Sequence, residues 1–223
     1  MYMISIVIPV YEMAGVADKM LMDLLYSIQK QTYKDYEIIV SDESPDRSLQ
    51  DLCFGFENLK YFVNNGSKGA CYNLNNALIH AKGSIIKPMF QDDQFYDIDC
   101  LQKFANISSP WAVCTSEHLG GRNPHVPYFN ADVYELARGC NTFGSPSAVG
   151  WKANEFTFDE NLKWLFDCDF YARMINRYGQ PQILDTKVLI REWEGMATRT
   201  VATGSVRITE LEYIENKFSN LRL

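Results

Sequence analysis

The sequence predicts an α/β fold with a Rossmann-like, mostly parallel sheet flanked by helices. In the N-terminal half, short apolar runs rich in β-branched residues alternate with segments whose apolar residues recur at helical spacing. Strand, helix and strand in succession form a βαβ unit, which places the two strands in parallel. The runs are almost continuously apolar, as expected for strands buried on both faces.

Length and composition are consistent with a single domain over residues 1–223. The chain is 47% hydrophobic, carries a formal net charge of −7 and has no Lys/Arg block, so a nucleic-acid partner is not expected. Its six cysteines lack CxxC spacing, which predicts reduced thiols in a cytoplasmic protein rather than a disulfide framework or a zinc site. We see no signal peptide and no apolar run of about 18 residues.

The first βαβ unit spans about 40 residues. Ile4–Val10 reads as a buried strand, and Pro9 should stand at its end because proline cannot donate to a ladder. In Asp18–Gln31 the apolar residues follow i, i+3, i+4, i+7, which predicts an amphipathic helix on the sheet. Tyr36–Val40 is the second strand.

The turn after the second strand, 41–46, has two interpretations. Asp42 at a strand's carboxyl end could accept a hydrogen bond from a base N–H or a sugar hydroxyl. Its residues could instead cap the short helix expected near 48–54.

A third strand, expected at an edge, is Leu59–Val63. Asn65 and Gly66 mark a turn, a helix covers 70–81, and Gly83 fits the residue after its C-cap. The apolar run 85–90 then reads as another buried strand.

Two adjacent carboxylates, Asp92 and Asp93, follow this strand. Ligands of open α/β sheets bind at the carboxyl ends of strands, and hard divalent cations prefer carboxylate oxygens. The pair therefore suggests a metal bound to a phosphate, although a surface loop with two solvated acids is the alternative.

The C-terminal half is predicted with shorter elements. Strands are expected at 111–115, 148–151, 183–184 and 188–190, and helices at 163–178, ended by Gly179, and at 207–218. Asp167 and Asp169 lie near the start of the first helix, roughly 200° apart around its axis. GxGxxG after the first strand and GxxxxGK[ST] are both absent from the sequence, which disfavours dinucleotide oxidoreductases and P-loop enzymes.

Residues 4–199 resemble the family 2 inverting glycosyltransferases, which have the GT-A fold. The opening strand, 5–11, and the turn 41–46 are similar to the family's first strand and Asp-Asp-Gly-Ser-Thr-Asp turn. Gln91-Asp92-Asp93 stands in place of its Asp-x-Asp, and 166–173 in place of its base-bearing Glu-Asp-x-Asp helix. Gly69, Asn75, Ala81 and Gly83 match the run before the metal motif.

The resemblance implies a role for each motif. Pro9, Tyr11, Glu12 and Asp42 would surround the nucleoside of the donor. Asp93, with Asp92, would hold Mn²⁺ or Mg²⁺ against the diphosphate, and Asp167 would be the general base. It further implies a nucleotide-sugar half at 1–96, an acceptor-binding and catalytic half at 97–200, and a C-terminal helix at 201–223.

Three residues depart from the family pattern. Gln91 replaces the first carboxylate of Asp-x-Asp, Phe166 replaces the Glu before the base, and Trp193 stands where many relatives have a His. Trp193 is also readable as a packing aromatic. Asp169 remains an alternative base, and Arg191 and Arg199 are either diphosphate ligands or solvated residues.

The expected function is an inverting, metal-dependent transfer from a nucleotide sugar, a UDP-sugar first, to a carbohydrate or lipid-linked acceptor in polysaccharide biosynthesis. Such an acceptor is compatible with peripheral membrane association. A catalytically impaired nucleotide-sugar or glycan binding protein of the same fold is the alternative, because of Gln91 and Phe166. A nucleotidyltransferase on a related fold would usually have a basic, Gly-rich loop after the first strand. Residues 11–16 are not basic, which disfavours this class.

Overall fold

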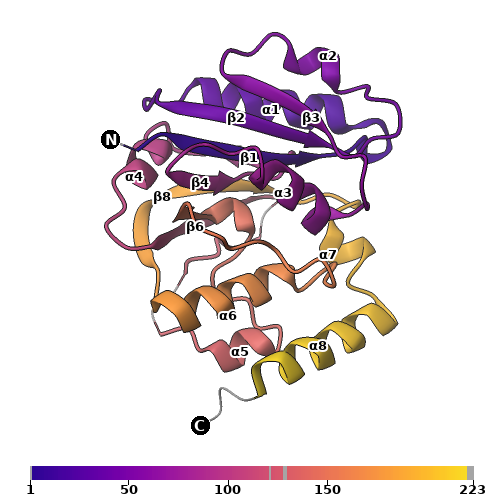
Figure 1. Ribbon diagram of the computed structural model, residues 1–223, viewed down its shortest axis with the longest axis vertical. Helices are drawn as coiled ribbons and strands as arrows, with labels where there is room; N and C mark the ends of the chain where they lie inside the picture. The colour runs from indigo at the N-terminus through magenta and orange to yellow at the C-terminus, as the bar shows by residue number, and fades with distance from the viewer. Residues whose placement is uncertain (1, 121, 128–129, 220–223) are drawn as a thin grey trace.

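One eight-stranded sheet forms the centre of the computed structural model, which describes residues 2–120, 122–127 and 130–219 (Figure 1). The strand order is β3-β2-β1-β4-β7-β6-β8-β5. The strands are β1 (Ile4–Val10), β2 (Tyr36–Asp42), β3 (Leu59–Val63), β4 (Ile85–Pro88), β5 (Gln94–Phe95), β6 (Trp111–Leu119), β7 (Val149–Lys152) and β8 (Gln182–Arg191).

The sheet is mostly parallel, as predicted. β1 pairs in parallel with β2 and β4, β2 with β3, and β6 with β8. β7 runs antiparallel between β4 and β6, and β5 runs antiparallel to β8. The strand β3 lies at an edge, which confirms the expectation for Leu59–Val63.

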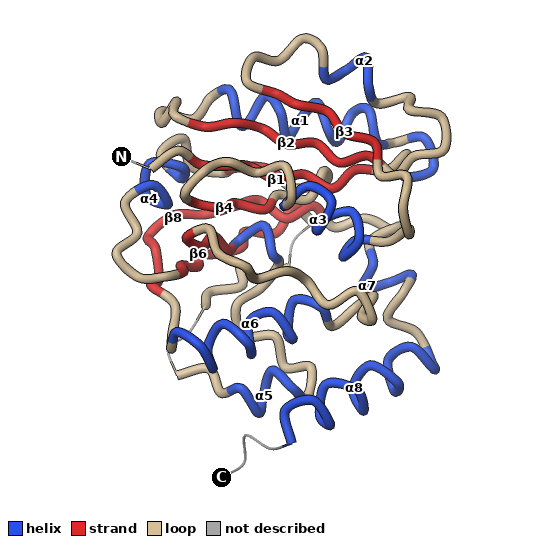
Figure 2. The backbone as a smooth tube through the Cα atoms, viewed as in Figure 1, coloured by secondary structure: helices blue, strands red, loops and turns tan. Residues whose placement is uncertain are grey.

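Helices cover both faces of the sheet. The α-helices are α1 (Ala17–Gln29), α2 (Gln50–Cys53), α3 (Ala70–Leu78), α4 (Cys100–Ala105), α5 (Val133–Ala137), α6 (Phe166–Tyr178), α7 (Ala197–Thr200) and α8 (Gly204–Phe218), with 3₁₀ turns η1 (Met13–Gly15) and η2 (Pro146–Ala148). The helices α5, α6 and α8 lie side by side on the far side from β3 (Figure 2).

Side-chain alternation along β1 divides the core into two layers. Ile6 and Ile8 belong to the cluster that includes α1 and α4, whereas Val7 belongs to the cluster with α3 and α6. All three side chains are fully buried. A strand covered on both faces is apolar at nearly every position, which explains the almost continuous run in the sequence. The exception in β1 is the buried Ser5, whose hydroxyl donates to Glu37.

Pro9 is the last residue but one of β1, near the strand's end as expected, and lies opposite Ser41. It is accommodated there because β1 pairs with β4 only as far as Val7↔Pro88. Gly83 follows five residues after the end of α3, so it is not the residue after the C-cap. A Cβ at position 83 would stand 2.5 Å from the backbone nitrogen of Ser5, so a glycine allows the close approach of two chain segments.

Within the described residues, no helix is both long and apolar enough to cross a membrane.

Candidate active site

The acidic pair lies in a tight turn directly after β4. The backbone N–H of Phe90 donates to Ser147 Oγ at 2.9 Å, and that of Asp93 donates to the Phe90 carbonyl at 3.0 Å. Trp193 Nε1 donates to Asp92 Oδ2 at 2.9 Å, and the backbone N–H of Arg191 approaches Asp93 Oδ1 at 3.3 Å. The turn therefore has a fixed conformation.

A buried lysine in β4 stabilises this turn through Ser147. Lys87, in β4, is fully buried and donates to the carbonyl oxygens of Ser147 and Pro88. Its ammonium lies 5.0 Å from the ring centroid of Phe104 and 5.4 Å from that of Phe95. Lys87 thus holds Ser147, the residue whose hydroxyl anchors the start of the acidic turn.

The two carboxylates form a donor set that fits a divalent cation. Burial raises the pKa of Asp92, and burial together with the neighbouring charge of Asp92 raises that of Asp93 well above its usual range. No salt bridge to either acid occurs among the described residues. No cluster of three His, Cys, Asp or Glu suited to a metal occurs there either, so the protein would supply two ligands and leave the others to phosphate and water.

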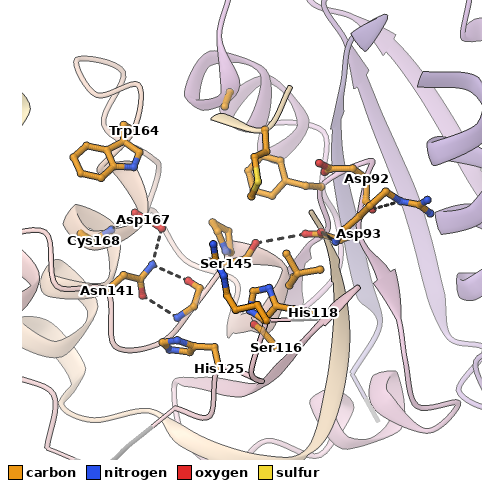
Figure 3. Close-up of a pocket in the computed structure, with 18 of the residues that line it drawn as sticks. Asp92, Asp93, Ser116, His118, His125, Asn141, Ser145, Trp164, Asp167 and Cys168 are labelled. Carbon is orange, nitrogen blue, oxygen red and sulfur yellow. Dashed lines mark hydrogen bonds between the residues drawn. The ribbon is translucent and has the colours of Figure 1, made fainter. Parts of the chain in front are cut away.

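Asp92 and Asp93 line a cavity of about 470 Å³. Figure 3 shows them on one side of this cavity and Asp167 with Asn141 on the other. The lining also includes Ser116, His118, Arg122, His125, Ser145, Trp164, Phe166, Arg191 and Met196.

Asp167 is held in the cavity wall at the start of α6. Its Oδ2 accepts from Asn141 Nδ2 at 2.7 Å, and its Oδ1 accepts from the backbone N–H of Cys168 at 2.7 Å. Burial raises the pKa of Asp167 to about 6, although these hydrogen bonds act in the opposite direction. A carboxylate with such a pKa is ionised at neutral pH and more basic than a solvated one.

Asp169 points the other way, into the protein. It is fully buried and binds Arg173 Nε at 2.8 Å and Lys217 Nζ at 2.7 Å. The contact with Lys217 ties α6 to α8, and Asp169 is not among the residues that line the cavity. Of the two candidate bases, Asp167 alone faces the acidic pair.

The four residues expected around the nucleoside lie at or just after the ends of β1 and β2, outside the lining of this cavity. Pro9 is buried within β1, whereas Tyr11 is 40% exposed. Glu12 accepts from the backbone N–H of Gly15 at 3.3 Å.

Asp42 has a demonstrable local role. It is 1% exposed; its Oδ1 accepts from the backbone N–H of Ser44 at 2.7 Å, and its Oδ2 accepts from the Tyr61 hydroxyl. It therefore shapes the turn after β2 but does not cap α2, whose N-cap residue Leu49 has no side-chain capping bond. A nucleoside could use only its remaining lone pairs.

Comparison with known proteins decides the family. A family model described as Glycosyl transferase family 2 matches residues 5–115, from β1 through the acidic pair into β6. The chain belongs to glycosyltransferase family 2.

Curated relatives of this family 2 chain are glycosyltransferases. One, the putative colanic acid biosynthesis glycosyl transferase WcaA of Escherichia coli, is 25% identical over 195 residues, which cover 80% of this chain and 68% of the relative. Another, the GalNAc(5)-diNAcBac-PP-undecaprenol β-1,3-glucosyltransferase of Campylobacter jejuni, is 32% identical over 96 residues, 41% of this chain. The chain spans only 30% of that second relative's length.

Solved structures confirm the GT-A fold. TarS of S. aureus residues 1–349 in complex with UDP-GlcNAc superposes with a TM-score of 0.72 at 20% identity, covering 99% of this chain and 67% of that one. A mannosyltransferase from Pyrobaculum calidifontis in complex with GDP-Man and Mn²⁺ has a TM-score of 0.60 at 14% identity, covering 84% and 56%. A longer TarS chain is matched over 43% of its length.

The three departures from the family 2 pattern have distinct surroundings. Phe166 lines the cavity, with its ring 6.3 Å from that of Phe90 and 5.8 Å from that of Phe158. Trp193 packs partly buried against the core and donates to Asp92. Gln91 is 2% exposed and does not line the cavity.

Sequence reasoning did not find several residues of this site. Asn141 and Ser145 lie in a polar loop far from both acidic motifs in sequence, and no local pattern marks them. Glu210, in α8, accepts from the backbone N–H groups of three consecutive residues ahead of Asp167. A lone Glu in a predicted helix gives no signal for such a role.

Proposed function

We propose that this family 2 chain is an inverting, metal-dependent glycosyltransferase that moves a sugar from a nucleotide-sugar donor to a hydroxyl of a glycan or lipid-linked acceptor. The observation that carries the proposal is that Asp93 and Asp167 line one cavity from opposite sides. Sugar transfer needs two such groups, one where the diphosphate leaves and one where the acceptor hydroxyl loses its proton.

Asp167 is the proposed general base. A sugar hydroxyl is a poor nucleophile, so a carboxylate within hydrogen-bond reach takes its proton as it attacks. Attack on the face of the sugar opposite the departing diphosphate inverts the anomeric centre. Asn141 and the Cys168 backbone hold both oxygens of Asp167.

Asp93, together with Asp92, is the proposed holder of Mn²⁺ or Mg²⁺ against the donor diphosphate. A divalent ion bound there would offset the charge that develops on the leaving group. Arg191 lines the same part of the cavity, but its guanidinium already pairs with Asp23 at 2.8 Å.

The proposed donor is a UDP-sugar, with its nucleoside among Pro9, Tyr11, Glu12 and Asp42. Two TarS structures contain UDP or UDP-GlcNAc, and a relative from Escherichia coli that is 32% identical over 94 residues is named as a UDP-Glc-dependent glucosyltransferase. These names support UDP as the nucleotide of the donor. The proposed division of the chain is a nucleotide-sugar half at 1–96, an acceptor-binding and catalytic half at 97–200, and a C-terminal helix at 201–223.

The proposed acceptor is lipid-linked, as in polysaccharide biosynthesis. Two relatives are named for undecaprenol-linked diphosphate acceptors and one for colanic acid biosynthesis. Work on such an acceptor would bring the protein to the cytoplasmic face of a membrane as a peripheral protein.

The experiment is a thermal-shift panel of UDP-, GDP-, dTDP- and CMP-sugars with and without Mn²⁺, followed by NMR of the anomeric configuration of any product. A ligand at 100 times its dissociation constant stabilises a protein by about 2.7 kcal/mol. We expect a Mn²⁺-dependent shift with the UDP-sugar, its loss in Asp93→Ala, and an inverted product.

Other outcomes would contradict parts of this proposal. Equal metal-dependent binding in Asp93→Ala, measured by calorimetry, would remove the metal site from the acidic pair. Donor binding without any transfer or hydrolysis would favour the alternative of a binding protein with the same fold.

A further inference from the structure

The Gln91 side chain hydrogen-bonds to both backbone groups of Tyr11, its N–H and its carbonyl. The Gln91 Oε1 accepts from the Tyr11 N–H at 2.6 Å, and the Gln91 Nε2 donates to the Tyr11 carbonyl at 3.0 Å. The side chain is 2% exposed and lies outside the lining of the cavity. Its neighbours Phe90, Asp92 and Asp93 all face that cavity.

An amide supplies both the acceptor and the donor of this pair without carrying a charge at any pH. An ionised carboxylate offers acceptors alone, so an ionised acid at position 91 would leave the Tyr11 carbonyl facing a negative charge. An aspartate would also be one methylene shorter. In this chain, therefore, residue 91 is not a lost metal ligand. Its side chain links two segments that lie 80 residues apart in sequence.

The linked segment is the loop that follows β1. Two non-glycine residues in it, Met13 and Ala14, have φ of 48° and 53°, in the left-handed region. Such conformations persist only where surrounding contacts hold them. The Tyr11 side chain lies near Asp92, whose charge, after burial, raises the pKa of the phenol.

The acidic turn has anchors of its own. Ser147 Oγ holds the Phe90 N–H, and Trp193 holds Asp92. Loss of the Gln91 amide would thus release the loop after β1 while the two carboxylates keep their places.

We infer that Gln91 is a positioning residue for the nucleoside end of the donor site, which it serves by fixing the Tyr11 backbone beside the acidic pair. This inference rests on the proposed function, because it takes the loop after β1 as the nucleoside site. It predicts that a carboxylate at position 91 weakens donor binding instead of strengthening metal binding.

Gln91→Glu tests the inference, with Gln31→Glu as the matched control. Gln31 is also buried, at 1% exposed, and also bridges two backbone groups, accepting from the Leu101 N–H at 2.9 Å and donating to the Asp97 carbonyl at 2.8 Å. It lies outside the cavity lining. Both variants lose the same kind of hydrogen bond, so both should lower the melting temperature.

Calorimetry in the presence of Mn²⁺ then measures how tightly each variant binds two probes, UDP and inorganic pyrophosphate. We expect Gln91→Glu to weaken UDP binding by about tenfold or more, the equivalent of one lost buried hydrogen bond, while pyrophosphate binding changes little. Gln31→Glu should bind both as the unmodified protein does. Gln91→Met, of similar length and uncharged, should repeat the selective loss of UDP affinity.

The contrary results are distinct from one another. Unchanged UDP affinity in Gln91→Glu, or an equal loss in Gln31→Glu, overturns the positioning role while the proposed function stands. Failure of the unmodified protein to bind UDP or pyrophosphate overturns the proposed function and this inference with it. If both position 91 variants fail to fold, amide exchange at Tyr11 decides: slow exchange that UDP slows further supports the link, and fast exchange overturns it.

Discussion

Asn141 Nδ2 donates to Asp167 Oδ2 at 2.7 Å, across 26 residues of sequence. The amide is oriented in advance, because its Oδ1 accepts from the backbone N–H groups of Phe143 at 3.0 Å and Gly144 at 2.8 Å. Asp167, the proposed base, is thus held by the loop that contains Asn141. The Asn141 side chain also maintains the conformation of that loop.

The first prediction concerns the pH dependence of transfer. Because Asp167 must be ionised to act as a base, kcat/KM should fall below a pKa of about 6. Asn141→Ala removes a hydrogen bond to the ionised form, so the acidic limb should move to higher pH. A damaged loop alone would lower the rate at every pH without moving that limb. An acidic limb near pH 4 in the unmodified protein would contradict the assignment of Asp167.

A second prediction follows from the same pKa and concerns stability. The pKa of Asp167 rises from 3.8 to about 6 on folding, so between these values the folded state binds the proton more tightly than the unfolded state. Stability from this group is therefore present below about pH 4 and is lost as the pH rises toward 6. In Asp167→Asn this component of the pH dependence should vanish from urea unfolding curves, and an unchanged curve would contradict it.

The third prediction separates the two carboxylates of α6. Asp167→Asn should lower turnover by roughly 10²–10⁴-fold with little change in donor affinity, since the base acts on the acceptor. Asp169→Asn removes a buried charge that Arg173 and Lys217 share, so it should cost about 3–5 kcal/mol of stability. Its activity per folded molecule should stay close to normal. The reverse ranking in steady-state assays would move the base to Asp169.

Most of the fold could be predicted because it rests on local patterns. β1, α1 and β2 each carry an apolar period within a dozen residues, and their alternation fixes a parallel sheet. β5 was not predicted, because Gln94 and Phe95 are a strand only through pairing with β8. A pattern of two residues has no period to detect.

The site was predicted only where it coincides with strand and helix ends. Asp93 and Asp167 stand at such ends, and the resemblance to a family supplied their roles. Asn141 and Glu210 act through contacts that only the folded chain creates. Gln91 seemed to be a missing carboxylate from the aligned motif, because a one-dimensional pattern does not contain the Tyr11 backbone that its amide binds.

The fourth prediction concerns Glu210, which joins α8 to the wall of the cavity. Its carboxylate is 5% exposed and accepts from the backbone N–H groups of Lys163 at 2.7 Å, Trp164 at 3.0 Å and Leu165 at 2.9 Å. A carboxylate is favoured at a helix N-terminus, and one amide cannot accept all three bonds. Glu210→Gln should cost about 1.5–3 kcal/mol in urea unfolding. Glu212→Gln, on the exposed side of α8, is the control, and equal stability of the two variants would contradict this role.

The last prediction concerns Trp193, a partly buried aromatic residue that contacts Asp92. Its indole N–H donates to Asp92 Oδ2 at 2.9 Å, and its ring packs directly on Gly195, where an added Cβ would clash with it. Trp193→Phe keeps an aromatic ring but removes the indole N–H, so the Asp92 carboxylate loses this hydrogen bond and becomes free to rotate. Because hydrogen bonds to charged groups contribute about 1.5–3 kcal/mol, we expect the affinity for Mn²⁺ with UDP to fall by roughly tenfold or more.

Calorimetry and thermal unfolding together distinguish the two roles of Trp193. If the indole N–H orients Asp92, Trp193→Phe should lose affinity while its melting temperature falls little, because the ring still fills its place against the core. If the residue is only a packing aromatic, the same variant should bind Mn²⁺ and UDP as the unmodified protein does. A second variant, Trp193→Leu, removes the ring as well and should lower both quantities. An affinity that follows the melting temperature through both variants would leave packing as the whole role of Trp193.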